Sequence, residues 1–173
     1  MQDRKMLLQD LAYIFSYPQH EYRKRVERVM AACGDETDLP RIWRPFAEYV
    51  QEQKFTGIEE AFTRTFDLRP STCLEIGWHL YGEDYKRGQF LVKMRQTLAE
   101  YHIPESVELP DHLSHCLLLL AELPEAEADL FLQDYLKPAL SKILTGFEPD
   151  NPFRYAIQFL DEILNVTTGI CHG

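Results

Sequence analysis

The chain has 173 residues, of which 28 are acidic and 18 are basic, so its formal net charge is −10. This length fits one domain with a substantial core, and a hydrophobic content of 45% is typical of a folded globular protein. The acidic balance argues against general nucleic-acid binding, which needs Lys and Arg to meet phosphates, and favours basic partners.

The chain contains no segment typical of a membrane span or a secretory signal. Its longest apolar run, Cys116 to Ala121, is far shorter than the ~20 residues that a span needs. Met1 to Lys5 is polar and leads into an amphipathic segment rather than a signal-peptide core. We therefore expect a cytoplasmic protein without membrane insertion, whose four cysteines, none in a C-x-x-C pair, stay reduced.

Apolar residues recur at helical spacing through the first third of the chain. The pattern predicts helices over residues 7–15, 19–33, 40–50 and 58–66. The second of these presents a basic face, typical of a solvated surface but also suited to an anion or a partner. That face consists of Arg23, Lys24, Arg25 and Arg28.

The middle of the chain predicts a turn and two more helices. After the turn at residues 67–71, a helix over 74–81 is expected to end at Gly82, where a left-handed cap is cheap only without a Cβ. The longest helix is expected over 83–101. Gly88 near its start would cost about 1 kcal/mol relative to Ala, so we expect it to permit the close approach of another helix.

The last third predicts three further helices and a frayed end. Pro110 suits a first helical position, with Asp111 in the first turn. A helix follows from about residue 130 to Gly146, in which Pro138 predicts a kink or break. The last helix begins near Pro152, and the tail 167–173 is expected to fray. Because no segment alternates like a strand, the sequence predicts a single all-α domain, residues 1–173, of eight or nine helices.

Acidic residues concentrate in the stretch from Gln96 to Leu136, which contains no Lys or Arg. They are Glu100, Glu105, Glu108, Asp111, Glu122, Glu125, Glu127, Asp129 and Asp134. With no basic residue in the same stretch to balance them, we expect this surface to attract a basic ligand.

Catalytic motifs are weak. There is no G-x-S-x-G and no Gly-rich phosphate loop, so the chain is not expected to be an enzyme. His112, His115 and Cys116 would share one helix face and can ligate zinc, but no further ligand stands near them, so no bound metal is expected. A small metal-dependent helical enzyme using these three residues, and a scaffold binding a partner through the basic face near Arg25, remain the alternatives.

The segment Glu108-Leu109-Pro110-Asp111-His112 joins two acids and an imidazole at a helix start, next to an aromatic-rich stretch. This combination suits an amphipathic peptide, with apolar side chains in a groove and basic ones against carboxylates. We expect the groove to be lined by Trp78, Tyr81, Tyr85, Phe90 and Leu117. Glu108 and Asp111 would meet the basic end of the peptide, and His112 would make binding sensitive to pH.

Four segments, in this order and spacing, resemble a known family. They are Leu11-Ala12-Tyr13-Ile14-Phe15-Ser16-Tyr17-Pro18; Phe62-x-x-Thr65-Phe66-Asp67 with Arg69 and Ser71 after it; Gly82-x-Asp84-x-x-Arg87-Gly88; and Glu108-Leu109-Pro110-Asp111-His112-Leu113. The family is that of the redox-enzyme maturation chaperones of the NarJ/TorD type, and the branch most similar is the nitrate reductase delta-subunit (NarJ) branch.

The resemblance implies an all-helical, non-catalytic cytoplasmic chaperone connected with nitrate assimilation. Such proteins bind the N-terminal region of a molybdoenzyme catalytic subunit and hold it for insertion of the molybdenum cofactor and, in many cases, for twin-arginine export. The client would be nitrate reductase or a related type II enzyme, and no cofactor would stay bound to the chaperone itself. The resemblance places peptide binding on Pro110, Asp111 and His112. We expect a monomer or a weak homodimer.

Overall fold

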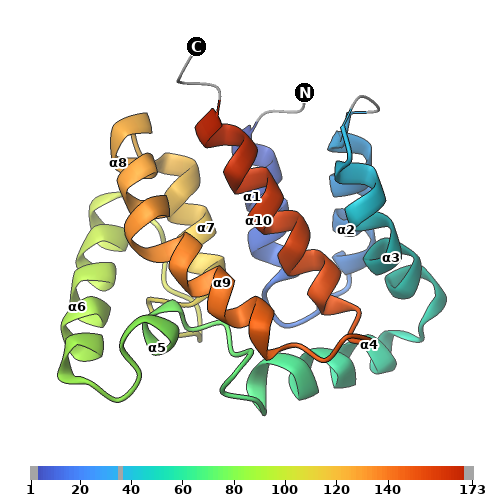
Figure 1. Ribbon diagram of the computed structural model, residues 1–173, viewed down its shortest axis with the longest axis horizontal. Helices are drawn as coiled ribbons and strands as arrows, with labels where there is room; N and C mark the ends of the chain where they lie inside the picture. The colour runs from blue at the N-terminus through green and yellow to red at the C-terminus, as the bar shows by residue number, and fades with distance from the viewer. Residues whose placement is uncertain (1–3, 35–36, 170–173) are drawn as a thin grey trace.

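The computed structural model describes residues 4–34 and 37–169, and these residues form an all-α bundle (Figure 1). Its helices are α1 (Arg4–Ile14), α2 (Tyr22–Ala32), α3 (Leu39–Glu52), α4 (Phe55–Phe62), α5 (Ile76–Tyr81), α6 (Tyr85–Glu100), α7 (Leu113–Glu122), α8 (Glu125–Phe131), α9 (Lys137–Gly146) and α10 (Phe153–Gly169), with π-helical segments η1 (Thr63–Asp67) and η2 (Leu132–Leu136). Because α4 continues into η1, and α8 continues through η2 into α9, the described residues form nine continuous helices. The predicted fold class is confirmed.

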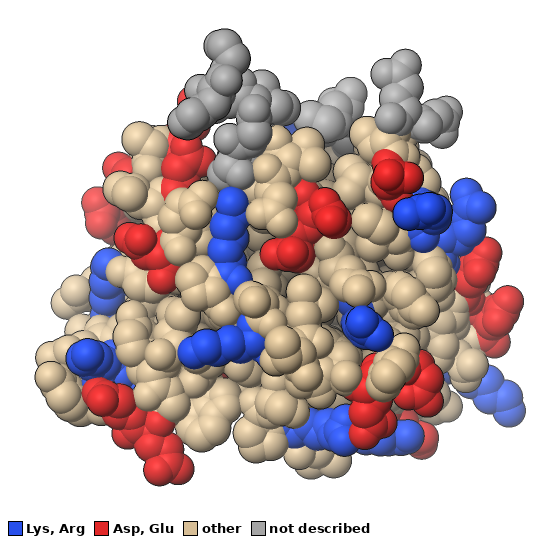
Figure 2. Space-filling model, viewed as in Figure 1, with Lys and Arg blue, Asp and Glu red and all other residues tan. Residues whose placement is uncertain are grey.

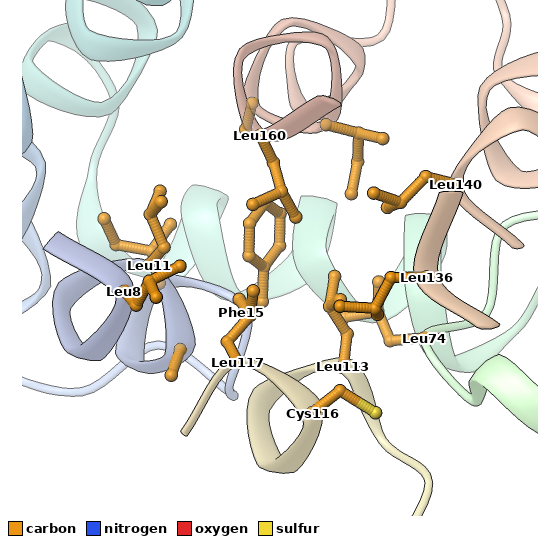
Figure 3. Close-up of a cluster of buried hydrophobic side chains, with 14 of the residues drawn as sticks. Leu8, Leu11, Phe15, Leu74, Leu113, Cys116, Leu117, Leu136, Leu140 and Leu160 are labelled. Atoms are coloured by element: carbon orange, nitrogen blue, oxygen red, sulfur yellow. The ribbon is translucent and has the colours of Figure 1, made fainter. Parts of the chain in front are cut away.

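The core lies between the first helix and the helices of the second half. α1 packs against α2 and α7, while α10 packs against α3 and α9. The buried side chains that meet there come from α1, α7, α9 and α10 and are drawn in Figure 3, which labels Leu8, Leu11, Phe15, Leu113, Leu117, Leu140 and Leu160. The helices of the first and second halves of the described chain thus share one core.

A second cluster of aromatic rings joins α3, α4, η1 and α10. Phe153 of α10 lies at the centre, with its ring 5.3 Å from that of Phe46 and 5.1 Å from that of Phe66. Trp43 packs against Phe159 at 4.6 Å. Aromatic pairs at these separations stabilise a core beyond the area they bury.

Three of the four residues of the predicted basic face form hydrogen bonds to other parts of the same chain. Arg25 and Arg28 donate to the carboxylate of buried Asp10, at 2.8 Å and 2.7 Å. Arg23 donates to the backbone carbonyls of Val50 and Gln53 at the end of α3, where a cation satisfies carbonyls that the helix leaves free. This face therefore fastens α2 to α1 and α3.

Pro138 disturbs its helix as predicted. It lies in the first turn of α9, and the five residues of η2 immediately before that helix are π-helical rather than α-helical. Proline has no N–H to donate to the residue four positions earlier, so the helix widens there. The expectation of a frayed tail is not met at its start, because α10 continues through Gly169; residues 170–173 lie outside the described residues.

The glycines behave differently from one another. Gly82 ends α5 as predicted, with φ at +58°, a value that favours glycine, but its ψ of −128° differs from that of the left-handed helical cap that was expected. Gly88 does not permit a close approach, because a Cβ there would meet nothing within 4 Å. The close approach occurs at Gly77, where a Cβ would lie 2.6 Å from Oδ2 of Asp111 and 2.9 Å from the ring of Phe90.

Candidate functional site

The Pro-Asp-His segment is buried and belongs to a short antiparallel bridge rather than to a helix. Ile76 N–H donates to the carbonyl of Asp111 at 3.0 Å, and Leu113 N–H donates to the carbonyl of Leu74 at 2.8 Å. α7 therefore begins at Leu113, not at Pro110 as predicted, because the backbone of Asp111 is already committed to the start of α5. The segment ties α5 to α7.

Asp111 is a fully buried acid between these two helices. Its Oδ2 accepts a hydrogen bond of 2.8 Å from the backbone N–H of Gly77. Burial raises the pKa of Asp111, while the Gly77 hydrogen bond and the nearby Arg87 oppose that rise. Asp111 therefore packs between α5 and α7 and does not reach solvent. The sequence had led us to expect that it would meet a ligand at the surface.

His112 caps α7 and is neutral over the physiological range. Its Nδ1 accepts from Ser114 N–H at 3.2 Å. Burial, together with the neighbouring His115, lowers the pKa of His112 to about 3. The expectation that His112 makes binding sensitive to pH is therefore wrong.

The proposed metal ligands are occupied by other contacts. Ser106 N–H donates to Nε2 of His115 at 3.0 Å, so Nδ1 carries the proton and donates to the carbonyl of Leu109 at 2.8 Å. Cys116 is buried, and burial raises its pKa well above the usual value. Among the described residues, no group of three or more His, Cys, Asp or Glu side chains is arranged to hold a metal ion.

The five predicted groove residues divide into three groups by their exposure. Phe90 and Leu117 are buried in the core, while Tyr85 is 72% exposed. Trp78 and Tyr81 are half-buried and line a cavity of about 650 Å³ between α5 and α9, which we call the α5–α9 pocket. Lys142 also lines this pocket and donates to the carbonyl of His79 at 2.7 Å, whereas Glu108 and Asp111 do not line it.

Three carboxylates from three elements are close enough to influence one another's pKa values: Asp67 of η1, Glu75 at the start of α5, and Glu108 before α7. We call them the acidic cluster. Burial raises the pKa of Glu108, and the charges of Asp67 and Glu75 raise it further. Burial also raises the pKa of Asp67, with Glu75 adding to the rise and a hydrogen bond with Thr63 opposing it. The described residues show no Lys or Arg ion-paired with any of the three.

Apolar side chains are exposed on the same segments as the acidic cluster. Leu68 directly follows Asp67 and is 71% exposed, while Val107 and Leu109 flank Glu108 and are 100% and 43% exposed. Each of these two segments thus offers an acidic group with an exposed apolar neighbour. The sequence pointed to Glu108, but Asp67 and Glu75 were missed because they are brought to it only by the fold.

The acidic stretch of residues 96–136 is partly neutralised by residues outside it. Glu105 pairs with Arg95 at 2.8 Å, and Glu122 pairs with Lys5 at 2.7 Å, so the expectation that nothing balances these acids is wrong for these two. Figure 2 shows acidic side chains over α8 at the upper left and both charges mixed over much of the rest of that face. The acidic cluster, which has no ion pair among the described residues, is therefore a better candidate site for a basic ligand than the stretch as a whole.

These features define an all-α bundle with an acidic, partly apolar surface beside an aromatic pocket. A family model described as nitrate reductase delta subunit matches residues 34–162, and the chain belongs to this family. It is also similar to the nitrate reductase molybdenum cofactor assembly chaperone NarJ of Escherichia coli strain K12 and of strain O157:H7, at 34% identity over 99 residues in each case. Each match covers 57% of this chain but only 41% of the relative.

The resemblance found in the sequence motifs is confirmed by this family membership. The described parts of the chain include no helix both long enough and apolar enough to cross a bilayer. Cys33, Cys73 and Cys116 are free thiols, as expected, and Cys171 lies outside the described residues.

Proposed function

We propose that this protein is an assembly chaperone rather than an enzyme. It binds the N-terminal region of a molybdoenzyme catalytic subunit in the cytoplasm and holds it for molybdenum cofactor insertion and, where relevant, for twin-arginine export. The client is nitrate reductase or a related type II enzyme, and the chaperone, a monomer or weak homodimer, keeps no cofactor bound. The proposal is supported by family membership, by the chaperone function of the relatives and, above all, by the acidic cluster, which is not ion-paired among the described residues, with its exposed apolar neighbours.

The acidic cluster and the α5–α9 pocket suit the two parts of one ligand. Two segments connect the acidic cluster to the α5–α9 pocket. One is Glu75 followed by α5 (Ile76–Tyr81), and the other is the turn from Asp67 to Ser71. The six residues of α5 rise by about 9 Å, which an extended peptide covers in about three residues. We therefore propose a ligand with a basic residue about three positions from an apolar one.

The predicted site residues take two roles in this proposal. Trp78, Tyr81, Tyr85 and Glu108 have exposed surface and contact the peptide. The buried residues keep α5, α6 and α7 in register beneath it and are Phe90, Pro110, Asp111, His112 and Leu117. In this proposal four of the nine predicted residues contact the peptide, and the five buried ones act by supporting them.

The two alternatives lose support for specific reasons. A metal-dependent enzyme would need ligand atoms that His115 and His112 already use in hydrogen bonds. A scaffold that binds through its basic face would need cations that Asp10 and the end of α3 already hold.

The proposal predicts that the doubly substituted variant Glu75→Gln, Glu108→Gln binds a basic N-terminal client peptide about tenfold more weakly at low salt. Each substitution removes a charge that is partly shielded by solvent, so each contributes only a fraction of the ~1.4 kcal/mol that a tenfold change represents. Calorimetric titration measures the effect. Glu162→Gln on α10 removes one negative charge outside the cluster and should leave affinity unaltered, and equal affinities for all three proteins would refute the assignment.

Binding of the basic peptide is also expected to weaken in mild acid. The raised pKa values of Asp67 and Glu108 mean that these acids take up protons at a higher pH than ordinary carboxylates, whose pKa is about 4. A protonated acid no longer attracts a cation, so affinity should rise with pH through that range. Because the pKa of His112 is about 3, His112→Gln should not remove this pH dependence in a pH series of titrations. Loss of the dependence in that variant would contradict our assignment.

A further inference from the structure

Arg87 lies over the ring of Trp78, one of the residues that line the α5–α9 pocket. Its guanidinium carbon is 5.5 Å from the centre of the Trp78 ring, a distance at which a cation is attracted to the ring face. Its Nε is buried and has no hydrogen-bond partner among the described residues. A buried donor without a partner is costly, so this position of Arg87 leaves one of its polar atoms poorly satisfied.

Asp111 has the complementary defect. The side chain is fully buried, Oδ2 is bonded to Gly77, and Oδ1 has no partner among the described residues. Oδ2 of Asp111 lies 2.6 Å, and Cγ of Arg87 3.5 Å, from the position of a Cβ built on Gly77, so the two atoms are no more than 6.1 Å apart. Rotation about the outer bonds of Arg87 can therefore carry its guanidinium toward Oδ1.

We propose that the face of Trp78, with the Glu75 carboxylate at the start of the same helix, is a subsite for a guanidinium-bearing side chain of the bound segment. Arg87 occupies this subsite in the free protein and moves to Oδ1 of Asp111 when an arginine of the partner replaces it. This inference rests on the proposed function and identifies the group that is recognised. It makes Arg87 a positioning residue and Trp78 a contact residue.

Charge and shape both favour arginine as the occupant. The free protein itself places a guanidinium on this ring, and Glu75 is not ion-paired with any Lys or Arg among the described residues. A planar guanidinium stacks on an indole and can bond a carboxylate at the same time, which a compact ammonium does less well. When Arg87 moves to Asp111, its Nε and Oδ1 of Asp111 each gain the partner that they lack. This gain offsets the loss of the contact between Arg87 and the Trp78 ring.

The first test uses the isotope-labelled protein and two small probes, N-acetyl-arginine amide and N-acetyl-norleucine amide. The arginine probe should shift the NMR signals of the Trp78 indole N–H and the Arg87 Nε–H, and the norleucine probe should shift neither. Exchange of the Arg87 Nε–H with solvent should slow as the arginine probe saturates the site. Equal shifts with both probes, or no shift at Trp78 with arginine, would overturn the subsite.

The second test asks whether Asp111 receives the displaced arginine. Asp111→Asn leaves the amide carbonyl to accept from Gly77 but removes the charge that attracts Arg87, so affinity for the arginine probe should fall about fivefold. Circular dichroism establishes that the variant is folded, and unchanged affinity in the folded variant would overturn the exchange. Since this variant is buried and is itself open to unfolding, the wild-type probe experiment is decisive alone.

Titrations with client peptides, compared with those of the small probes, separate this inference from the proposed function. N-terminal client peptides should bind at least fivefold more weakly when each arginine is replaced by norleucine. Peptide binding without any such difference would overturn the arginine subsite and leave the chaperone function standing. Binding of the arginine probe at Trp78 without binding of any client peptide would support the subsite and refute the proposed function.

Discussion

Replacing Asp10 with alanine is expected to lower the free energy of unfolding by about 3–5 kcal/mol, the usual cost of removing one partner from a buried charge pair. Asp10 is only 2% exposed, and its two oxygens accept three hydrogen bonds from Arg25 and Arg28. Without this carboxylate, the partly buried guanidinium of Arg25 keeps only the longer contact with Glu21, and Arg28 loses its hydrogen bonds to Asp10. Urea denaturation followed by circular dichroism measures the loss.

Glu21→Ala is the matched control for Asp10→Ala. Glu21 also pairs with Arg25, but at 3.7 Å and with 41% of its side chain exposed. Exposed pairs of this kind contribute at most about 1 kcal/mol, so this variant should be nearly as stable as the wild type. A similar loss in both variants would show that Asp10 is not the anchor of α2.

Gly77→Ala should destabilise the protein by about 1–3 kcal/mol, the usual cost of overpacking a core. The new methyl group would lie 2.6 Å from Asp111 Oδ2 and 2.9 Å from the Phe90 ring. Both neighbours stand too close to the new methyl group and have to shift. Asp111, however, is held in place by the hydrogen bond that it accepts from the N–H of Gly77 itself. The same substitution should weaken peptide binding, because the contact of α5 with Asp111 positions Trp78. Thermal unfolding and calorimetry report the two effects.

Gly88→Ala is the contrasting substitution in the neighbouring helix. A Cβ at Gly88 meets nothing within 4 Å, and alanine is favoured over glycine in a helix by about 1 kcal/mol. This variant should therefore be as stable as the wild type or more so, with unchanged peptide affinity. If Gly77→Ala were as well tolerated as Gly88→Ala, the packing of α5 against the Pro-Asp-His segment would be less tight than the structure indicates.

The fold could be predicted from local pattern because most helices carry their own apolar periodicity and stop signals. Pro18, Gly82 and Pro138 mark turns and irregularities that depend on the chemistry of the residue alone. The start of α7 could not be predicted in this way. Pro110 and Asp111 have the composition of a helix start, but a pairing with residues 74–76, distant in sequence, takes the carbonyl of Asp111 and the N–H of Leu113.

The candidate site was harder to predict than the fold, because exposure is a tertiary property. Helical periodicity cannot tell that Leu117 and Phe90 face the core while Trp78 and Tyr81 line a pocket. Nor does periodicity indicate that the charges of Asp67 and Glu75 act on Glu108 in the folded protein. Gly88 attracted attention as an isolated glycine in a helix, whereas Gly77, inside a strongly apolar segment, makes the close contact.

Calorimetric titration of the purified protein with basic, amphipathic N-terminal peptides of molybdoenzyme catalytic subunits from the same genome tests the proposed function most directly. We predict saturable binding of one such peptide, weakened by salt because the acidic cluster meets its cations through partly exposed charges. A peptide with its basic residues replaced should bind more weakly in the same titration. No binding of any of these peptides would contradict the proposal that this protein is a chaperone for a molybdoenzyme N-terminus.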